Sequence, residues 1–247
     1  MTNSSSSHNH HQSGFTLVEL TIVLTITTLL LGGLMMTLSA QREATASSET
    51  QRRLNEARDA ILGFAAANGR LPCPANSGSG LTGIESPVGG GNCSNPWNGF
   101  LPAITLGLTP TNENGYALDG WGNPIRYAVT TYPNSTYCVT PVFATTNCLK
   151  AAWNGGASLA PDLRICNTAS CATGTELANN AVAVIFSQGK NGASAPTSSD
   201  EIANSDNDRV FVSHTLTSAG PNEFDDLVTW ISPNILYSRL IAAGRLP

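Results

Sequence analysis

Residues 13–33 read SGFTLVELTIVLTITTLLLGG, and one carboxylate, that of Glu19, stands at the start of a long uncharged run. From Leu20 to Leu38 the sequence contains no Asp, Glu, Lys or Arg. As an α-helix, a run of this length rises about 28 Å, which is close to the thickness of a bilayer core. The sequence therefore predicts a membrane-spanning helix over residues 15–40, with a carboxylate at its edge that needs a partner.

Helical periodicity continues past the apolar run. Residues 41–70 contain no proline, and their apolar side chains fall along one stripe, as in a helix that buries one face. This stripe consists of Leu54, Ala57, Ile61 and Phe64 or Ala65. Asn68-Gly69 is typical of a helix end, and Pro72 prevents simple continuation. We expect one helix from Phe15 to about Asn68, whose part at 41–70 packs on a globular domain at 71–247.

Residues 1–14 form a polar segment without Lys, Arg, Asp or Glu. They lack the charged start, the apolar centre and the small-residue cleavage site of a secretory signal peptide. Histidines could suggest a metal site here, but no partner ligands accompany His8, His10 and His11. We therefore expect an unstructured leader at 1–14.

The overall composition favours an extracytoplasmic protein. Charged residues make up 12% of the 247 residues, against a usual share of roughly 25%, and Asn, Ser, Thr and Gly take their place. The net charge is −5, and no basic cluster is larger than Arg52-Arg53. Binding of nucleic acid therefore has little electrostatic support.

The region 71–247 contains short strand candidates separated by stretches rich in Gly, Asn, Ser and Pro. The candidates are residues 125–130, 138–143, 181–187 and 209–214. The segment VAVIF at 182–186 is the strongest, and we expect it at the centre of a sheet. The tail at 224–240 is expected to form one or two short segments packed against the core. With the long helix, this pattern predicts an α+β fold.

The six cysteines are Cys73, Cys93, Cys138, Cys148, Cys166 and Cys171. None of them forms a CxxC pair, and most intervals between them are too wide for a zinc knuckle. With a membrane-directed N-terminus, an even number favours disulfides in an oxidising compartment; free thiols in a cytosolic protein are the alternative. Six cysteines allow many connectivities, and pairing of sequence neighbours is the first hypothesis.

Residues 14–19, GFTLVE, together with the apolar helix that follows directly, resemble the start of the type IV pilins and of the pseudopilins of type II secretion systems. The resemblance implies that a prepilin peptidase cuts between Gly14 and Phe15 and methylates the new N-terminal amine of Phe15. It also implies a pilin-like α+β fold. In that fold the long N-terminal helix packs on a small antiparallel β-sheet domain with long disulfide-bonded loops.

Glu19 then has a role in assembly. A carboxylate within a bilayer costs about 2.5–3.5 kcal/mol on insertion scales, so it favours a position beside a positive charge. The free amine of Phe15 on a neighbouring subunit supplies that charge when the helices stack with an axial offset. A misaligned subunit would leave the charge uncompensated, so Glu19 rewards correct register. The alternative is an interfacial Glu at the end of an ordinary membrane anchor.

A second resemblance lies farther along the chain. Residues 119–127, DGWGNPIRY, look like the D-x-WGNP-x-x-Y segment of major pseudopilins, which bind calcium through a later S-x-G-x-D-G loop and a D-[IL]-x-x-W segment. This chain has SQGKNG at 187–192, with Asn191 in place of the loop Asp, and DLVTW at 226–230. The candidate calcium residues, including acidic residues of the insertion between the two segments, are Ser187, Asn191, Asp200, Asp206, Asp208 and Asp226. The alternative is a solvated acidic loop.

The resemblance implies a non-enzymatic structural subunit of a type IV pilus or of a type II secretion pseudopilus. It would be anchored in the bacterial inner membrane, with its globular domain in the periplasm or, after assembly, in a filament. Its implied partners are the prepilin peptidase and other subunits, which it meets through the N-terminal helix. A minor subunit is favoured over a major one because the globular part is large and loop-rich.

Two alternatives remain open on the sequence alone, a pilus-associated adhesin or tip protein and a membrane-anchored periplasmic hydrolase. The hydrolase would need His214, the only histidine outside the leader, with Ser213 or Ser187 and an aspartate. The sequence has no GxSxG nucleophile elbow.

Overall fold

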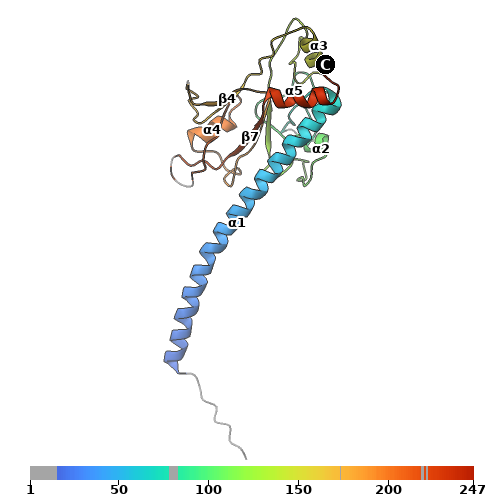
Figure 1. Cartoon of the computed structure of the whole chain (residues 1–247). Helices are drawn as coiled ribbons and strands as arrows, with labels where there is room; N and C mark the ends of the chain where they lie inside the picture. Colours follow the sequence, from blue (N-terminus) through green and yellow to red (C-terminus); the bar gives the residue numbers. More distant parts are fainter. Residues whose placement is uncertain (1–15, 78–82, 173, 218–219, 221) are drawn as a thin grey trace, which may run out of the picture. The chain divides into compact units, whose positions relative to one another are not determined.

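Figure 1 shows the computed structural model of the chain, which describes residues 16–77, 83–172, 174–217, 220 and 222–247, and only the backbone of residues 33–38. The chain divides into two compact units, Met1–Ala44 and Thr45–Pro247, and each is described by itself. The predicted leader at 1–14 and the predicted cleavage site at Gly14 and Phe15 lie outside the described residues.

Helix α1 comprises Leu17–Asn68 and contributes to both units. Its C-terminal end lies where the sequence predicts it. Gly69 adopts a left-handed φ of 70° and donates its N–H to the carbonyl oxygen of Ala65 at 2.7 Å. Glycine takes this conformation without strain, and the bond satisfies one of the free carbonyls of the last turn.

In the first unit, threonine hydroxyls donate to carbonyls of the preceding turn, as from Thr21 to Val18 and from Thr28 to Leu24, both at 2.8 Å. These bonds satisfy polar side chains on a largely apolar helix.

Within the described residues, no helix combines the length and the hydropathy that a membrane crossing needs. The membrane-spanning helix predicted over 15–40 is therefore not confirmed. The apolar part of α1 with described side chains is residues 17–32, which is shorter than the roughly 20 residues of a span.

The first sheet of the second unit has four antiparallel strands in the order β1-β2-β5-β7. These are β1 (Gly99–Phe100), β2 (Arg126–Val129), β5 (Ala183–Ser187) and β7 (Leu227–Ile231). Every residue of β5 is buried, as expected for the VAVIF segment at a sheet centre. The strands predicted at 125–130 and 181–187 are confirmed.

A second sheet has three strands in the order β4-β3-β6. These are β3 (Leu163–Cys166), β4 (Glu176–Ala181) and β6 (Val210–Val212), the last of which confirms the strand predicted at 209–214. Strand β3 pairs antiparallel with β4 and parallel with β6, so the domain differs from the single antiparallel sheet that we expected. Strand β4, ELANNA, is mostly exposed and polar, so no hydrophobic alternation reveals it in the sequence.

Short helices surround the two sheets. They are α2 (Ala103–Leu106), α3 (Cys148–Asn154), α4 (Ser199–Ser205) and α5 (Pro233–Ala242). The tail at 224–240 thus forms β7 and then α5, which begins with proline at its first position. The strand predicted at 138–143 is wrong. These residues form bends and a turn, because Pro141 lies among them and a disulfide ties Cys138 to the first residue of α3.

The stripe predicted on α1 is the face that the helix buries within the second unit. Leu54, Ala57, Ile61 and Ala65 are at most 1% exposed, whereas Phe64 is only partly buried. They share one core cluster with residues of β2, β5 and α5, and Figure 1 shows α5 beside the C-terminal end of α1. Burial of a large apolar side chain contributes about 1.5–3 kcal/mol, so this face holds the second half of the helix in place.

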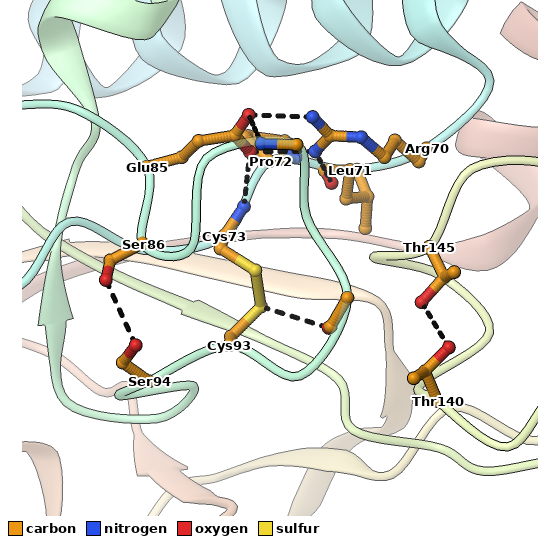
Figure 2. Close-up of a disulfide and its surroundings, with 12 residues drawn as sticks. Arg70, Leu71, Pro72, Cys73, Glu85, Ser86, Cys93, Ser94, Thr140 and Thr145 are labelled. Carbon is orange, nitrogen blue, oxygen red and sulfur yellow. Dashed lines mark hydrogen bonds and ion pairs between the residues drawn. A yellow bond between two sulfur atoms is a disulfide. The ribbon is translucent and has the colours of Figure 1, made fainter.

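Three disulfides join cysteines that are neighbours in the sequence, which is the pairing that the first hypothesis named. They are Cys73–Cys93, Cys138–Cys148 and Cys166–Cys171. Beside the first of them lies a buried ion pair between Arg70 and Glu85, with two nitrogen–oxygen distances of 2.7 Å (Figure 2). Closed loops of this kind lose less entropy on folding, and each disulfide contributes up to about 2–4 kcal/mol.

Candidate functional site

The described N-terminus of α1 is closed by reciprocal hydrogen bonds between Thr16 and Glu19. The Glu19 carboxylate accepts the Thr16 N–H at 3.0 Å and the Thr16 hydroxyl at 2.8 Å, and the Glu19 N–H donates to the Thr16 hydroxyl oxygen at 3.3 Å. This arrangement is a capping box, in which a Thr and a Glu three residues later satisfy the free N–H groups of the first turn.

The capping box gives Glu19 a structural role that was not predicted from the sequence. The T-x-x-E spacing of residues 16–19 was the signal that could have revealed it. The predicted cleavage, methylation and charge pairing involve Gly14 and Phe15, which lie outside the described residues, so these stay predictions.

The structure does not bring the six predicted calcium residues together. Ser187 donates its hydroxyl to Asp119 at 2.5 Å, and Asp200 lies beside the imidazole of His214 at 3.2 Å. Two further candidates are exposed near the C-terminal end of α4, namely Asp206 and Asp208. Part of the insertion forms helix α4, with Asp200 in its first turn, whereas Asp206 and Asp208 follow the helix and interact with each other.

The other two candidates, Asn191 and Asp226, lie at a group of carboxylates that we call the carboxylate cluster. It consists of Glu201 on α4 and of Asp225 and Asp226, which precede β7. One carboxylate oxygen of each lies within 4.8 Å of those of the other two. Glu201 and Asp226 are only 1% and 3% exposed, so their charges have little access to water.

Neutral donors satisfy this cluster only in part. Asn191 donates its backbone N–H to Asp225 and its side-chain amide to Glu201, both at 3.1 Å, and Asn204 donates to Asp226 at 2.7 Å. The Oδ1 atom of Asp225 is buried and has no hydrogen-bond partner among the residues that the structure describes. A buried acceptor without a partner costs about 1–3 kcal/mol, which a bound cation would offset.

The electrostatics of the cluster also favour a cation. Burial raises the pKa of Asp226 to about 8; the Asn204 hydrogen bond opposes this shift, and the charges of Glu201 and Asp225 add to it. Burial raises the pKa of Asp225 as well. Oxygen ligands of this kind suit calcium, whose charge would relieve the repulsion. The residues present therefore fit a calcium ion.

Glu201 and Asp225 were not predicted from the sequence as members of the carboxylate cluster. The Asp225-Asp226 doublet is visible in the sequence, and it was the available signal for Asp225. Glu201 gives no such signal, because only the fold brings α4 to the residues before β7.

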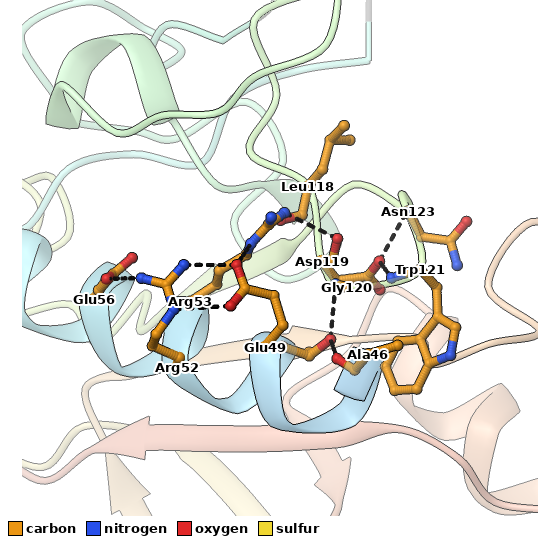
Figure 3. A network of polar contacts seen from close by, with 11 residues as sticks. Ala46, Glu49, Arg52, Arg53, Glu56, Leu118, Asp119, Gly120, Trp121 and Asn123 are labelled. Atoms are coloured by element: carbon orange, nitrogen blue, oxygen red, sulfur yellow. Dashed lines mark hydrogen bonds and ion pairs between the residues drawn. The ribbon is translucent and has the colours of Figure 1, made fainter. Parts of the chain in front are cut away.

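The WGNP turn, residues 118–124, lies against α1 (Figure 3). Asp119 is 2% exposed and accepts hydrogen bonds from the N–H groups of Trp121 at 2.9 Å and Asn123 at 2.8 Å. Burial raises the pKa of Asp119, while the hydrogen bonds from Ser187 and from the turn oppose that shift. The carboxylate of Asp119 therefore shapes the turn.

The residues of the hydrolase alternative have other partners. The two ring nitrogens of His214 lie 2.8 Å from the carbonyl oxygen of Thr215 and 3.2 Å from Asp200, and the ring stacks on Phe224. The hydroxyl of Ser187 donates to Asp119. Neither arrangement places a serine hydroxyl at the imidazole.

Comparison with known families matches residues 9–35 to the prokaryotic N-terminal methylation motif. Comparisons with curated proteins and with solved structures gave no match. The match includes the capping box of Thr16 and Glu19 and the start of α1. The chain carries the prepilin-type N-terminal methylation motif of type IV pilins and pseudopilins.

Proposed function

We propose that the chain is a structural subunit of a type IV pilus or of a type II secretion pseudopilus, without a catalytic role of its own. The observation that carries this proposal is the methylation motif at 9–35, which leads directly into a helix with a carboxylate in its first turn. A chain of this kind is processed at its N-terminus and joins a filament through its first helix.

In this proposal residues 15–40 hold the subunit in the inner membrane before assembly and pack against other subunits afterwards. Glu19 pairs with the Phe15 amine of a neighbour, and its capping box with Thr16 presets the side chain at the helix start. The unit Thr45–Pro247 then lies in the periplasm, where its three disulfides are stable.

Within this class we propose a minor subunit or a tip protein. The second unit carries a second sheet and the added helix α4, and long loops are tied by disulfides. A subunit that repeats along a filament must fit identical neighbours on every side, which such additions hinder. An adhesive role at a filament tip is the alternative that these same additions favour.

N-terminal processing is the direct test. In a strain with a prepilin peptidase, we expect the membrane-extracted protein to begin at Phe15 with a methylated amine, as measured by mass spectrometry of the N-terminal peptide. Gly14→Val should block the cut, because the small residue before the bond is lost, and Ser13→Val should leave it intact. A chain that begins at Met1, or at any residue after Ala40, would overturn the proposal.

We further propose that the carboxylate cluster binds calcium. Calcium at about a hundred times its Kd should stabilise the full-length protein in detergent by about 2.7 kcal/mol. Thermal melts with calcium and with a chelator measure this shift.

Asp225→Asn should raise the melting temperature in chelator, because repulsion among the carboxylates falls, and should abolish the calcium response. The exposed Asp208→Asn should preserve the response. Identical melts of the wild type, or an equal response in Asp225→Asn, would contradict calcium binding at this site.

A further inference from the structure

The WGNP turn rests directly on helix α1. Gly120 donates its N–H to the hydroxyl oxygen of Thr50 at 2.8 Å, and Arg53 donates to two carbonyl oxygens of the turn at 2.7 and 3.0 Å. A Cβ added to Gly120 would lie 2.1 Å from the carbonyl oxygen of Ala46, so no larger residue fits there (Figure 3). The position of the turn therefore depends on the position of residues 46–53 of the helix.

On its other side the turn holds the loop after β5. Ser187 donates its hydroxyl to Asp119 at 2.5 Å and accepts the Gly189 N–H at 3.1 Å. Asn123 donates its side-chain amide to the carbonyl oxygen of Gly189 at 2.7 Å. Asp119 and Ser187 are 2% and 0% exposed, and buried hydrogen bonds of this kind are electrostatically stronger than bonds in water.

The same loop continues into the carboxylate cluster. A Cβ added to Gly189 would lie 2.3 Å from Asp225 Oδ1, the buried oxygen that has no hydrogen-bond partner within the described part of the chain. Two residues later, Asn191 donates to both Asp225 and Glu201. Direct contacts thus run without a gap from Thr50 on α1, through the WGNP turn and the loop at 187–191, to the cluster.

We propose that the WGNP turn couples the carboxylate cluster to helix α1, so that a cation bound at the cluster stabilises residues 46–53 of the helix. This rests on the proposed calcium site. Without a cation, repulsion among the carboxylates loosens the loop at 187–191, and the turn loses the partners that hold it on the helix. With a cation, the loop is fixed and the turn clamps the helix. The carboxylate cluster and residues 46–53 of the helix both affect the position of the WGNP turn, and an energetic coupling requires such a shared element.

Hydrogen–deuterium exchange of the full-length protein in detergent tests this coupling. Calcium, compared with chelator, should lower exchange of peptides from the loop at 187–192 and from residues 46–53 by about tenfold. Thr50→Val keeps the shape of the side chain but removes the acceptor of the Gly120 N–H. In this variant the loop should still respond to calcium, and the helix response should be smaller, because only the Arg53 hydrogen bonds still join the turn to the helix. Ser48→Ala, an exposed change on the same turn of the helix, should preserve both responses.

The possible failures are distinguishable. If calcium protects the loop but not residues 46–53 of the wild type, or if Thr50→Val retains the full helix response, the coupling is wrong and the calcium site stands. If calcium protects neither segment, the calcium site is wrong, and a cation-free comparison decides on the coupling. In that comparison Asn191→Ala, which removes the amide donor to Glu201, should raise exchange at 46–53, and the rise should be smaller when Asn191→Ala is combined with Thr50→Val. Absence of that rise overturns the coupling.

Discussion

Replacement of Glu19 with alanine should lower incorporation of the chain into filaments by about a hundredfold, while the disulfide-bonded domain stays folded. The estimate follows because an unpaired charge within a bilayer costs about 2.5–3.5 kcal/mol, and about 1.4 kcal/mol corresponds to a factor of ten. In the variant, the Phe15 amine of a neighbouring subunit would lose its partner. Immunoblots of sheared filaments, normalised to the membrane-bound protein of a complemented strain, measure incorporation.

A glutamine variant separates the two roles of Glu19. A capping box accepts Glu or Gln at its third helical position, so Glu19→Gln retains the cap but loses the charge. If the charge is what assembly needs, Glu19→Gln should fail as Glu19→Ala does. Thr16→Val, which removes the hydroxyl of the cap but keeps the charge, should assemble with a smaller loss. Normal filaments from Glu19→Gln would show that Glu19 acts only as a helix cap.

The sequence predicted the second half of α1 well because local chemistry decides it. The stripe from Leu54 to Ala65 repeats at helical spacing, and Gly69 supplies the left-handed residue that ends the helix. The VAVIF segment was predictable for the same reason, since a short run of apolar residues suits a strand buried on both faces. In contrast, β4 is polar and exposed, and it exists because it pairs with β3.

The candidate sites also divide into features that the local sequence determines and features that tertiary contacts determine. The capping box was predictable, because Thr16 and Glu19 are three residues apart in one helix. The carboxylate cluster was not, because Glu201 meets Asp225 through tertiary packing. A resemblance drew attention to the loop at 187–192 and to the segment at 226–230, which supply Asn191 and Asp226 at the cluster. The other acidic candidates were selected only because they lie in an insertion. In the folded chain, Asp200 is in the first turn of α4 and lies beside His214 rather than at the cluster.

Removal of Glu85 should be the most destabilising single change in the second unit that we predict. Its carboxylate binds Arg70 through two hydrogen bonds of 2.7 Å and accepts the N–H groups of Cys73 and Gly89, both at 3.1 Å (Figure 2). The side chains of Arg70 and Glu85 are only 6% and 5% exposed. Glu85→Ala would leave a buried guanidinium without its counter-charge, which costs about 3–5 kcal/mol.

Urea unfolding of the full-length protein at neutral pH, followed by circular dichroism, measures this loss. The double variant Arg70→Met, Glu85→Leu should recover most of it, because both charges are removed together. Glu56→Ala, which breaks the exposed pair with Arg52, is the matched control and should change the free energy of unfolding little. A loss in Glu85→Ala no larger than that of the control would contradict a structural role for the pair.

The pair also fixes the direction of a pH dependence. Burial raises the pKa of Glu85, but the hydrogen bonds and charge of Arg70, with the N–H groups of Gly89 and Cys73, outweigh it and hold the pKa below its ordinary 4.5. A carboxylate with a lowered pKa binds its proton less tightly in the folded state than in the unfolded state. Its stabilisation is therefore present above pH 4.5 and is lost as the pH falls through the folded-state pKa. Glu85→Gln, which cannot ionise, should lose less stability than the wild type over this acidic range, and parallel pH profiles for the two proteins would rule out the linkage.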